Sequence, residues 1–437
     1  MRSNSRLRFA AILATALLGI AAVSCGRSDN NNSSSGGGGS TPAGGTPKPG
    51  PGFDGTTITV GAITPQSGAA AVIGNPLTAG NKLYFDALNA KGGVAGKYKV
   101  NLKIADSKYE TQTAVQQYGA TKAEVAMYVQ ILGTAIMNAI LAQLGTDGIY
   151  AGPATLDDFW VHEANLMPVG APYQIQMING VDYAVRKLDA KSKKLCALTT
   201  DDPYGEAGFK GLEYGAGQND MKVDVRATFK TGDKDFTAQI NQLQSAGCQV
   251  VGLVSLPTET SQILAKAAGS QFAPKWIGQS PTLVSALIAG PDGTPSALAP
   301  YLTANYTLMA EGPQWGDTSV PGMKQMLDDI AKYAPDQKPD IYFAFGYTQA
   351  WAASQILEQA AKNGDLSPKG IVTAASQVPK LTFGDLSGDY TYGDPADRNP
   401  PRRSTAFTPD PTVAGYLKAA EQNFTSKAAE EYKIEAP

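Results

Sequence analysis

The sequence predicts an α/β protein with two lobes, each built on a doubly wound parallel sheet. Short apolar runs rich in β-branched residues alternate with segments of roughly 10 to 15 residues that have helical spacing, which is typical of βαβ units. One interruption, near residues 170–180, divides this pattern into two halves of similar size. A length of 437 residues with 43% apolar content is sufficient for two or three domains with cores of their own.

The composition excludes several classes of function. The only histidine, His162, cannot by itself form a site that needs two imidazoles, such as the HExxH zinc proteases. The 36 basic residues are balanced by 39 acidic ones, so the chain has no basic excess with which to neutralise a phosphate backbone. We therefore expect no nucleic-acid partner.

The first 24 residues have the form of a signal peptide. Arg2, Arg6 and Arg8 precede an apolar run over 10–23, which is shorter than the roughly 20 residues that span a bilayer. The run ends in Ala-Val-Ser before Cys25, which resembles a bacterial lipobox except that Ala22 stands where Leu is usual. We expect cleavage before Cys25 and its lipidation; the alternative is a plain secretory signal followed by an incidental cysteine.

Residues 25–55 read as a lipidated cysteine followed by a disordered tether. The segment is nearly all Gly, Ser, Asn, Thr and Pro, a composition that cannot bury apolar area. A flexible chain of this length reaches about 30 Å, enough to hold a folded body just above a membrane. Loss of the signal removes three arginines and no acid, so the charge changes from −3 to −6.

The folded body begins with a strand and continues as strand–helix repeats. In the first half, strands are predicted at 58–63, 100–105, 126–132 and 149–152, with helices at 76–90, 112–125 and 136–144. In the second half, strands are predicted at 195–200, 223–229, 250–256 and 275–278, with helices at 204–218, 235–245 and 260–268. Two further helices, 323–333 and 342–361, precede a Gly-, Asp- and Pro-rich stretch, 380–407, that reads as hairpin and loop. Because ligands of open parallel sheets bind at the carboxyl ends of the strands, the loops there predict one cleft between the two lobes.

The search for catalytic chemistry finds no assembled site. The glycines Gly205, Gly208 and Gly211 open a helix, but such glycines more often permit close packing than bind an anion. Arg398, one of three arginines among prolines, predicts an exposed loop, and the nearby aspartates lack the spacing of a calcium loop. No nucleophile, base and oxyanion donor come together, so we predict a protein that is not an enzyme and needs no cofactor or metal.

Four motifs, in order along the chain, resemble those of the branched-chain amino-acid-binding proteins of ABC importers. They are Ile58-x-Val-Gly-x-Ile-x-Pro-x-Ser-Gly68, Asp86-x-x-Asn-Ala-Lys-Gly-Gly-Val-x-Gly96, Asp201-Asp-Pro-Tyr-Gly205 and Thr231-Gly-Asp-Lys-Asp-Phe236. The resemblance implies a type I periplasmic-binding fold, with two lobes joined by three crossover strands that close on a ligand by hinge motion. It implies crossovers near 178, 306 and 379. Lobe 1 is then 56–178 plus 307–378, lobe 2 is 179–306 plus 379–415, and residues 416–437 form a C-terminal helical tail.

The resemblance also implies ligand-binding residues. The family's donors to the ligand carboxylate correspond to Thr134, Ala135, Ala154 and Thr155, and its stacked ring corresponds to Tyr204. The remaining expected contacts are Ser67, Leu256, Gln279 and Ser280.

Two of these positions depart from the amino-acid binders. Leu256 stands where the family has a tyrosine, and Ser280 stands where it has an acid that pairs with the ligand ammonium. A buried ammonium without a paired charge costs several kcal/mol. Glu259 or Asp202 could replace the acid from nearby loops. A small carboxylate, amide or other largely apolar metabolite is otherwise as well matched as Leu, Ile or Val.

Cys196 and Cys248 are predicted at equivalent ends of neighbouring strands, within reach of a disulfide; two buried free thiols are the alternative.

The signal, the tether, the two lobes and the family motifs together predict a monomeric, lipid-anchored solute-binding protein on the extracytoplasmic face of a bacterial membrane. It would deliver a small molecule to an ABC permease complex. A ligand-sensing receptor of the same fold, which signals to a membrane partner without transport, is the alternative.

Overall fold

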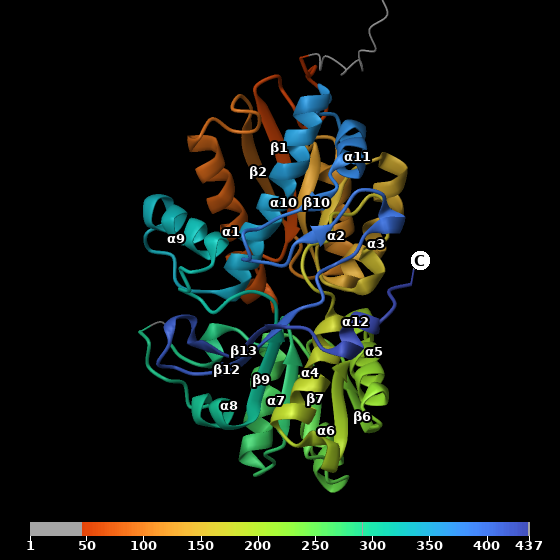
Figure 1. The fold of residues 1–437 in the computed structure, drawn as a ribbon, viewed down its shortest axis with the longest axis vertical. Helices are drawn as coiled ribbons and strands as arrows, with labels where there is room; N and C mark the ends of the chain where they lie inside the picture. Colours follow the sequence, from red (N-terminus) through yellow and green to blue (C-terminus); the bar gives the residue numbers. More distant parts are fainter. Residues whose placement is uncertain (1–45, 291, 436–437) are drawn as a thin grey trace, which may run out of the picture. The chain divides into compact units, whose positions relative to one another are not determined.

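The computed structural model of the chain describes residues 46–290 and 292–435 (Figure 1). The signal segment, Cys25 and most of the expected tether lie outside these residues. The end of the expected tether is not a free linker, because Phe53 is buried in the core of lobe 1. Within the described ranges, no helix is long and apolar enough to cross a membrane, and no three His, Cys, Asp or Glu side chains are grouped so that they could hold a metal ion.

Lobe 1 contains a parallel four-stranded sheet in the order β2-β1-β3-β4. Its strands are β1 (Thr57–Thr64), β2 (Lys99–Asp106), β3 (Met127–Leu132) and β4 (Ala151–Ala154), and β4 is followed by the short 3-10 turn η1 (Asp158–Trp160). Its helices are α1 (Ala71–Ala90), α2 (Thr111–Thr121), α3 (Thr134–Asp147), α9 (Pro321–Tyr333), α10 (Ile341–Asn363) and α11 (Pro368–Gln377). A small antiparallel hairpin, β10 (Lys380–Leu381) and β11 (Tyr390–Thr391), packs on this lobe.

Lobe 2 contains a seven-stranded sheet in the order β13-β12-β9-β8-β7-β5-β6. Its strands are β5 (Leu195–Thr200), β6 (Val223–Phe229), β7 (Val250–Val254), β8 (Lys275–Gln279), β9 (Tyr306–Ala310), β12 (Ser404–Pro409) and β13 (Leu417–Phe424). The first five are parallel, whereas β12 and β13 are antiparallel additions. Its helices are α4 (Tyr173–Lys187), α5 (Pro203–Gln218), α6 (Thr237–Ser245), α7 (Pro257–Gly269), α8 (Ala299–Asn305) and α12 (Lys427–Glu431).

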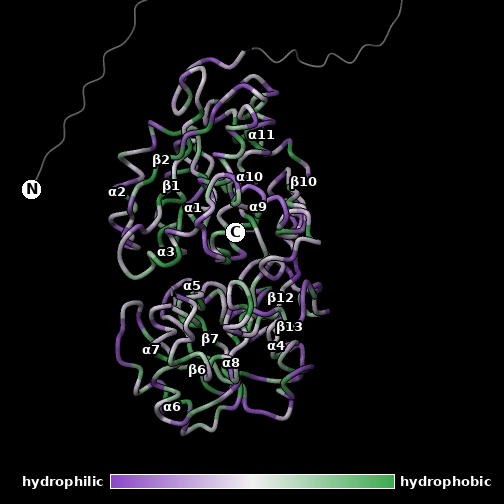
Figure 2. The backbone as a smooth tube through the Cα atoms, turned by 90° about the vertical axis from the view of Figure 1, so that its left-hand side faces the viewer, coloured by the Kyte–Doolittle hydropathy of each residue, from purple (hydrophilic) through white to green (hydrophobic). Residues whose placement is uncertain are grey.

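Both sheets are covered by helices on both faces, which confirms the predicted α/β fold with two doubly wound lobes. In lobe 1, Val60 points into the core under α1 and α10, while Ile63 points into the core under α2 and α3. In lobe 2, Leu198 and Ala197 point to opposite faces in the same way. Figure 2 shows hydrophobic stretches inside each lobe and hydrophilic ones mainly along the outer loops.

The chain crosses between the lobes at positions that differ from the expected ones. The segment near 170–180, read from sequence as a break, is helix α4, which packs on β8 and β9 of lobe 2. A Cβ at Gly180 would lie 2.7 Å from Cγ2 of Ile277, so glycine here permits close packing rather than ending the helix. The first crossover therefore precedes residue 173, and the second follows Ala310, because β9 belongs to the sheet of lobe 2.

The end of the chain also differs from the expectation. Residues 381–392 bury their apolar side chains in the core of lobe 1, so the third crossover lies after residue 392 instead of near 379. Residues 416–437 were expected to be helical, which is wrong for most of the segment. β13 pairs with β12 over Leu417–Phe424, and α12 has only 5 residues. The amphipathic pattern of this segment fits a sheet edge, with one face on the core and the other in solvent.

Three sequence features have structural roles. Cys196 and Cys248 form a disulfide, with their Cα atoms 5.9 Å apart, next to the paired strands β5 and β7. His162 lies with Nδ1 2.7 Å from the carbonyl oxygen of Pro395, which ties it to the third crossover. Arg398 is buried, not exposed as predicted, and donates to the carbonyl oxygens of residues 161, 163 and 166. It thereby fixes the first crossover to the third.

Candidate ligand-binding site

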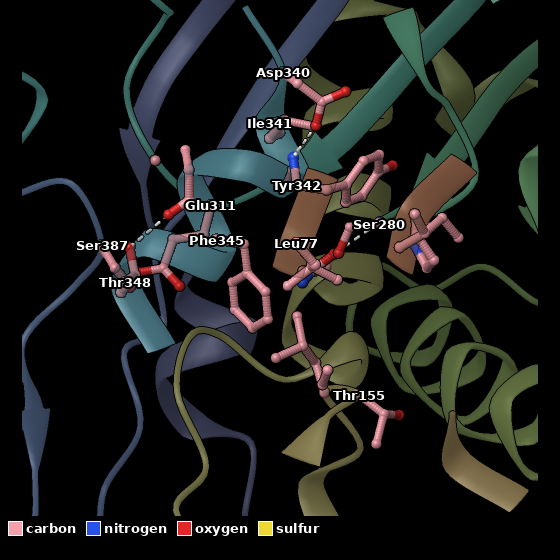
Figure 3. A pocket seen from close by; sticks show the side chains of 18 of the residues that line it. Leu77, Thr155, Ser280, Glu311, Asp340, Ile341, Tyr342, Phe345, Thr348 and Ser387 are labelled. Atoms are coloured by element: carbon pink, nitrogen blue, oxygen red, sulfur yellow. Dashed lines mark hydrogen bonds between the residues drawn. The ribbon is translucent and has the colours of Figure 1, made fainter. Parts of the chain in front are cut away.

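A pocket of about 1210 Å³, counting the space open to solvent, lies between the two lobes (Figure 3). Lobe 1 contributes Leu77 of α1 and residues that follow β3 and β4, while lobe 2 contributes Tyr204 of α5 and Leu256 before α7. The pocket thus opens at the carboxyl ends of both sets of parallel strands, where the sequence predicted a cleft. Among the described lining residues there is no Lys, Arg or His.

One group of hydroxyls stands at the start of α3. Thr134, the first residue of α3, and Thr155, just after β4, are both buried, and their Oγ1 atoms lie 2.6 Å apart. Thr155 also lies beside the hydroxyl of Tyr173. Three hydroxyls joined by two hydrogen bonds leave one hydroxyl hydrogen that can be donated into the pocket. Among the described residues, no side chain caps the first turn of α3. Its free N–H groups and the helix dipole favour an anion at this end.

Two buried tyrosines stand at the start of α4 and α5. The rings of Tyr173 and Tyr204 meet edge to face, with centroids 5.0 Å apart. Burial raises the pKa of Tyr173 to about 12 and that of Tyr204 well above its usual range, so both hydroxyls are neutral. We call the group Thr134, Thr155, Tyr173 and Tyr204 the head site.

Six of the nine residues expected from sequence line this pocket: Thr134, Ala154, Thr155, Tyr204, Leu256 and Ser280.

The other three lie outside the lining. The hydroxyl of Ser67 donates to Asp106 across 2.7 Å, and Ala135 is exposed on α3. Gln279 is buried beneath α5, where its Oε1 would lie 2.4 Å from a Cβ at Gly208. Placing an expected contact at the end of a strand identifies the correct loop. Adjacent residues of that loop can point in different directions, so an expected contact can face away from the pocket.

Neither substitute for the missing acid reaches the pocket. Glu259 is buried and accepts from the backbone N–H of Gly232, while Asp202 caps α5 by accepting from the N–H of Gly205. Ser280 donates to Oε1 of Gln176 across 2.9 Å. The position that carries an acid in the amino-acid binders is therefore occupied by a hydroxyl that already has a partner.

Two carboxylates that the sequence analysis missed do line the pocket. Asp340 precedes α10 and accepts from the N–H groups of Tyr342 and Phe343, and burial raises its pKa to about 6. Its position before a long amphipathic segment is a recognisable capping signal. Figure 3 draws Asp340 and Glu311 away from Thr155.

Glu311 connects all three crossovers. It follows β9 on the second crossover and accepts from the N–H of Ala171 across 2.6 Å, just before α4. It also accepts from the hydroxyl of Ser387 across 3.0 Å and from the N–H of Gly388, both ahead of the third crossover. Burial raises the pKa of Glu311, while these hydrogen bonds lower it. No local sequence signal identifies this role, because its partners are far away in the chain.

The lobes touch directly across the mouth of the pocket. Thr258 at the start of α7 donates to the carbonyl oxygen of Ala69 across 3.1 Å. Tyr342 of α10 donates to the carbonyl oxygen of Leu283 in lobe 2. These contacts define a closed arrangement of the two lobes, with the pocket between them.

Two α/β lobes that both line one pocket have the architecture of a protein that binds a ligand between its lobes. The periplasmic binding protein family model matches residues 57–409, which is most of the chain, and the chain belongs to this non-enzymatic family.

Solved structures support the fold. A fatty acid ABC transporter substrate-binding protein from Thermomonospora curvata is 24% identical, with a TM-score of 0.81, and covers 89% of this chain and 97% of its own. A branched chain amino acid ABC transporter protein from Thermus thermophilus with bound valine is 15% identical, with a TM-score of 0.70, over 86% of this chain and 98% of its own.

A curated relative, Leu/Ile/Val-binding protein homolog 3 of Brucella melitensis, is 27% identical over 202 residues, which are 44% of this chain. The match spans about half, 53%, of that relative's length.

Proposed function

We propose that this protein is the solute-binding component of an ABC importer and that its ligand is a carboxylate with an apolar body, without an α-ammonium group. The observation that carries this proposal is the pairing of Thr134 and Thr155 beside the uncapped start of α3. The carboxylates among the described lining residues, Glu311 and Asp340, which could pair with an ammonium, lie away from Thr155. The oxygens of a carboxylate would accept from the free hydroxyl and from the N–H groups of the first helical turn.

The described residues that line the pocket place no carboxylate beside the head site, which separates this ligand from an amino acid; Asp157 and Asp202, whose charges reach Tyr173, lie outside the lining. In an α-amino acid the ammonium is attached to the carbon that bears the carboxylate, so its partner must stand beside the head site. Ser280 is the residue in that position, and its hydroxyl is engaged with Gln176. An ammonium left there without a counter-charge would cost several kcal/mol. The names of the relatives cover both ligand types, fatty acids and branched-chain amino acids.

The proposal includes the anchor and the transport partner. Cys25 would carry the lipid and the segment from residue 26 to the stretch that packs on lobe 1 around Phe53 would form the tether, which places the binding lobes at the extracytoplasmic face near a permease. Metabolic labelling with a radioactive fatty acid tests the anchor: label on the wild-type chain and none on Cys25→Ser is the expected result. Label on neither protein would contradict lipidation.

Thermal unfolding of the mature protein, freed of co-purified ligand, tests the ligand class. Isovalerate has the carbon skeleton of valine and 4-methylpentanoate has that of leucine. Each acid keeps the carboxylate and lacks the ammonium. We expect these acids to raise the melting temperature more than leucine, isoleucine or valine at the same concentration, because binding to the folded state alone stabilises it. Stabilisation by the amino acids and by none of the ammonium-free acids would contradict the proposal.

A further inference from the structure

We propose that the pocket continues from the head site into an apolar tail site that takes an unbranched aliphatic chain, so that the ligand is an elongated aliphatic carboxylate. The tail site consists of Trp315, Met323, Leu386, Phe407 and Leu417. This inference rests on the proposed function, because the head site has to hold the carboxylate.

The tail site is built where the crossovers meet. Met323 and Leu386 belong to the core of lobe 1, with Trp315 packed against it, and Phe407 and Leu417 belong to the core of lobe 2. A Cβ at Gly322 would lie 2.7 Å from Cβ of Leu386, so the start of α9 is in close contact with the loop of the hairpin β10–β11. Phe407 and Leu417 stand on the paired strands β12 and β13. An apolar chain in this position would touch both lobes.

The polar groups around the tail site already have hydrogen-bond partners within the protein. Ser387 donates to Glu311, whose other oxygen accepts from a backbone N–H. Thr348 donates to the carbonyl oxygen of Ala344 in its own helix, across 3.0 Å. Figure 3 shows Glu311, Ser387 and Thr348 together on one side of the pocket. Because these groups already have partners, this end offers the ligand an apolar wall.

The extent of the pocket favours a long ligand. Its lining runs from Thr134 and Thr155 at the head site to Phe407 and Leu417 at the other end. A ligand as small as valine would fill only the part near the head site. A longer chain would lie along the buried side chains of Phe407 and Leu417, and each methylene that leaves water in this way would tighten binding.

The test is a calorimetric titration of the full-length mature protein with straight-chain acids from butanoate to decanoate, each below its micelle concentration. We expect the dissociation constant to fall about fourfold for each methylene that enters the tail site. Ala414→Trp narrows this site, because exposed Ala414 lines the pocket and its neighbour Gly415 lies beside Trp315. This variant should lose the gain for decanoate and retain butanoate binding. Ala396→Trp, at an exposed alanine outside the lining, is the matched control and should behave as wild type.

The outcomes separate the two proposals. If short acids bind and longer ones bind no more tightly, the tail site is wrong and the proposed function stands. Retention of the full chain-length gain in Ala414→Trp, with both variants folded by circular dichroism, would also overturn the tail site. If the amino acids bind and no acid of any length does, the proposed function fails, and the tail site fails with it.

Discussion

Polar side chains stand near both ends of the pocket, but the two ends present opposite surfaces. At the head site, Thr155 lies between Thr134 and Tyr173; three hydroxyls joined by two hydrogen bonds leave one hydroxyl hydrogen for a ligand. At the tail site, Glu311 and Ser387 have backbone partners or each other and have nothing left to donate. The comparison teaches that the chemistry a pocket offers depends on which polar atoms lack a partner, not on how many polar residues line it.

The largest effect on ligand affinity is expected at the head site. Replacing both hydroxyls, Thr134→Val with Thr155→Val, removes the hydrogen bond that this group donates to the charged ligand, about 1.5–3 kcal/mol. We expect carboxylate binding to weaken roughly 10- to 100-fold, which calorimetry can measure. The two hydroxyls partner each other, and the Tyr173 hydroxyl beside Thr155 faces the pocket, so the free energy of unfolding should change by less than the binding energy.

Thr348→Val is the matched control for that pair. It removes a hydroxyl that also lines the pocket but donates within its own helix. Binding within about twofold of wild type is expected, because the ligand makes no use of this group. Equal weakening by Thr348→Val and by the head-site pair would break the distinction between the two ends.

The second prediction concerns Glu311. Glu311→Gln keeps the shape but turns an amide NH₂ group toward backbone N–H donors that need an acceptor. A buried donor left unpaired costs about 1–3 kcal/mol, so the free energy of unfolding should fall by about 2 kcal/mol in urea denaturation. Ser387→Ala removes one donor only and should cost less. A Glu311→Gln protein as stable as wild type would show that the crossovers do not depend on this carboxylate.

The third prediction uses pH. Burial raises the pKa of Asp340 from its ordinary value of 3.8 to about 6. A raised carboxyl pKa means that the folded state binds the proton more tightly than the unfolded state. The stability from this group is therefore full below pH 3.8, falls as the pH rises to about 6 and is constant above it. Asp340→Asn retains a residue type that caps helices well and removes the loss of folding stability that the carboxyl group causes as the pH rises.

We expect the variant to gain on the order of 1 kcal/mol over wild type between pH 4 and pH 7, after allowance for partial exposure. Urea unfolding at several pH values measures the difference. A stability difference that does not vary across this range would show that Asp340 titrates normally.

The smallest effect is expected at the mouth of the pocket. Thr258→Val removes the bond from lobe 2 to the carbonyl oxygen of Ala69, at an exposed position. Because that oxygen can turn to water, we expect a loss of about 0.5 kcal/mol, or roughly twofold in affinity for any ligand. Thr237→Val, at a half-buried threonine whose hydroxyl bonds only within its own lobe, is the control. A tenfold loss in Thr258→Val would mean that closure depends on this contact more than on the ligand.

Much of the architecture follows from local patterns. Alternation of apolar strands with helical segments predicts the two sheets, and the position of Thr134 and Thr155 after strands predicts that they share one edge. The crossovers that the resemblance implied were misplaced, because a motif or an apolar helix face does not show which lobe covers the segment. The first turns of α4 and the residues around Leu381 are examples, since each packs on the lobe opposite to the expected one.

By itself, then, the sequence determined the fold class, the loops that carry the head site and the loss of the acid at Ser280. Only the tertiary structure decided the tail site, the linking role of Glu311 and the burial of Arg398. The physical reason is separation along the chain. A strand-end hydroxyl is positioned by its own βα unit, whereas Trp315, Leu386 and Phe407 become one surface only after the chain has crossed between the lobes three times.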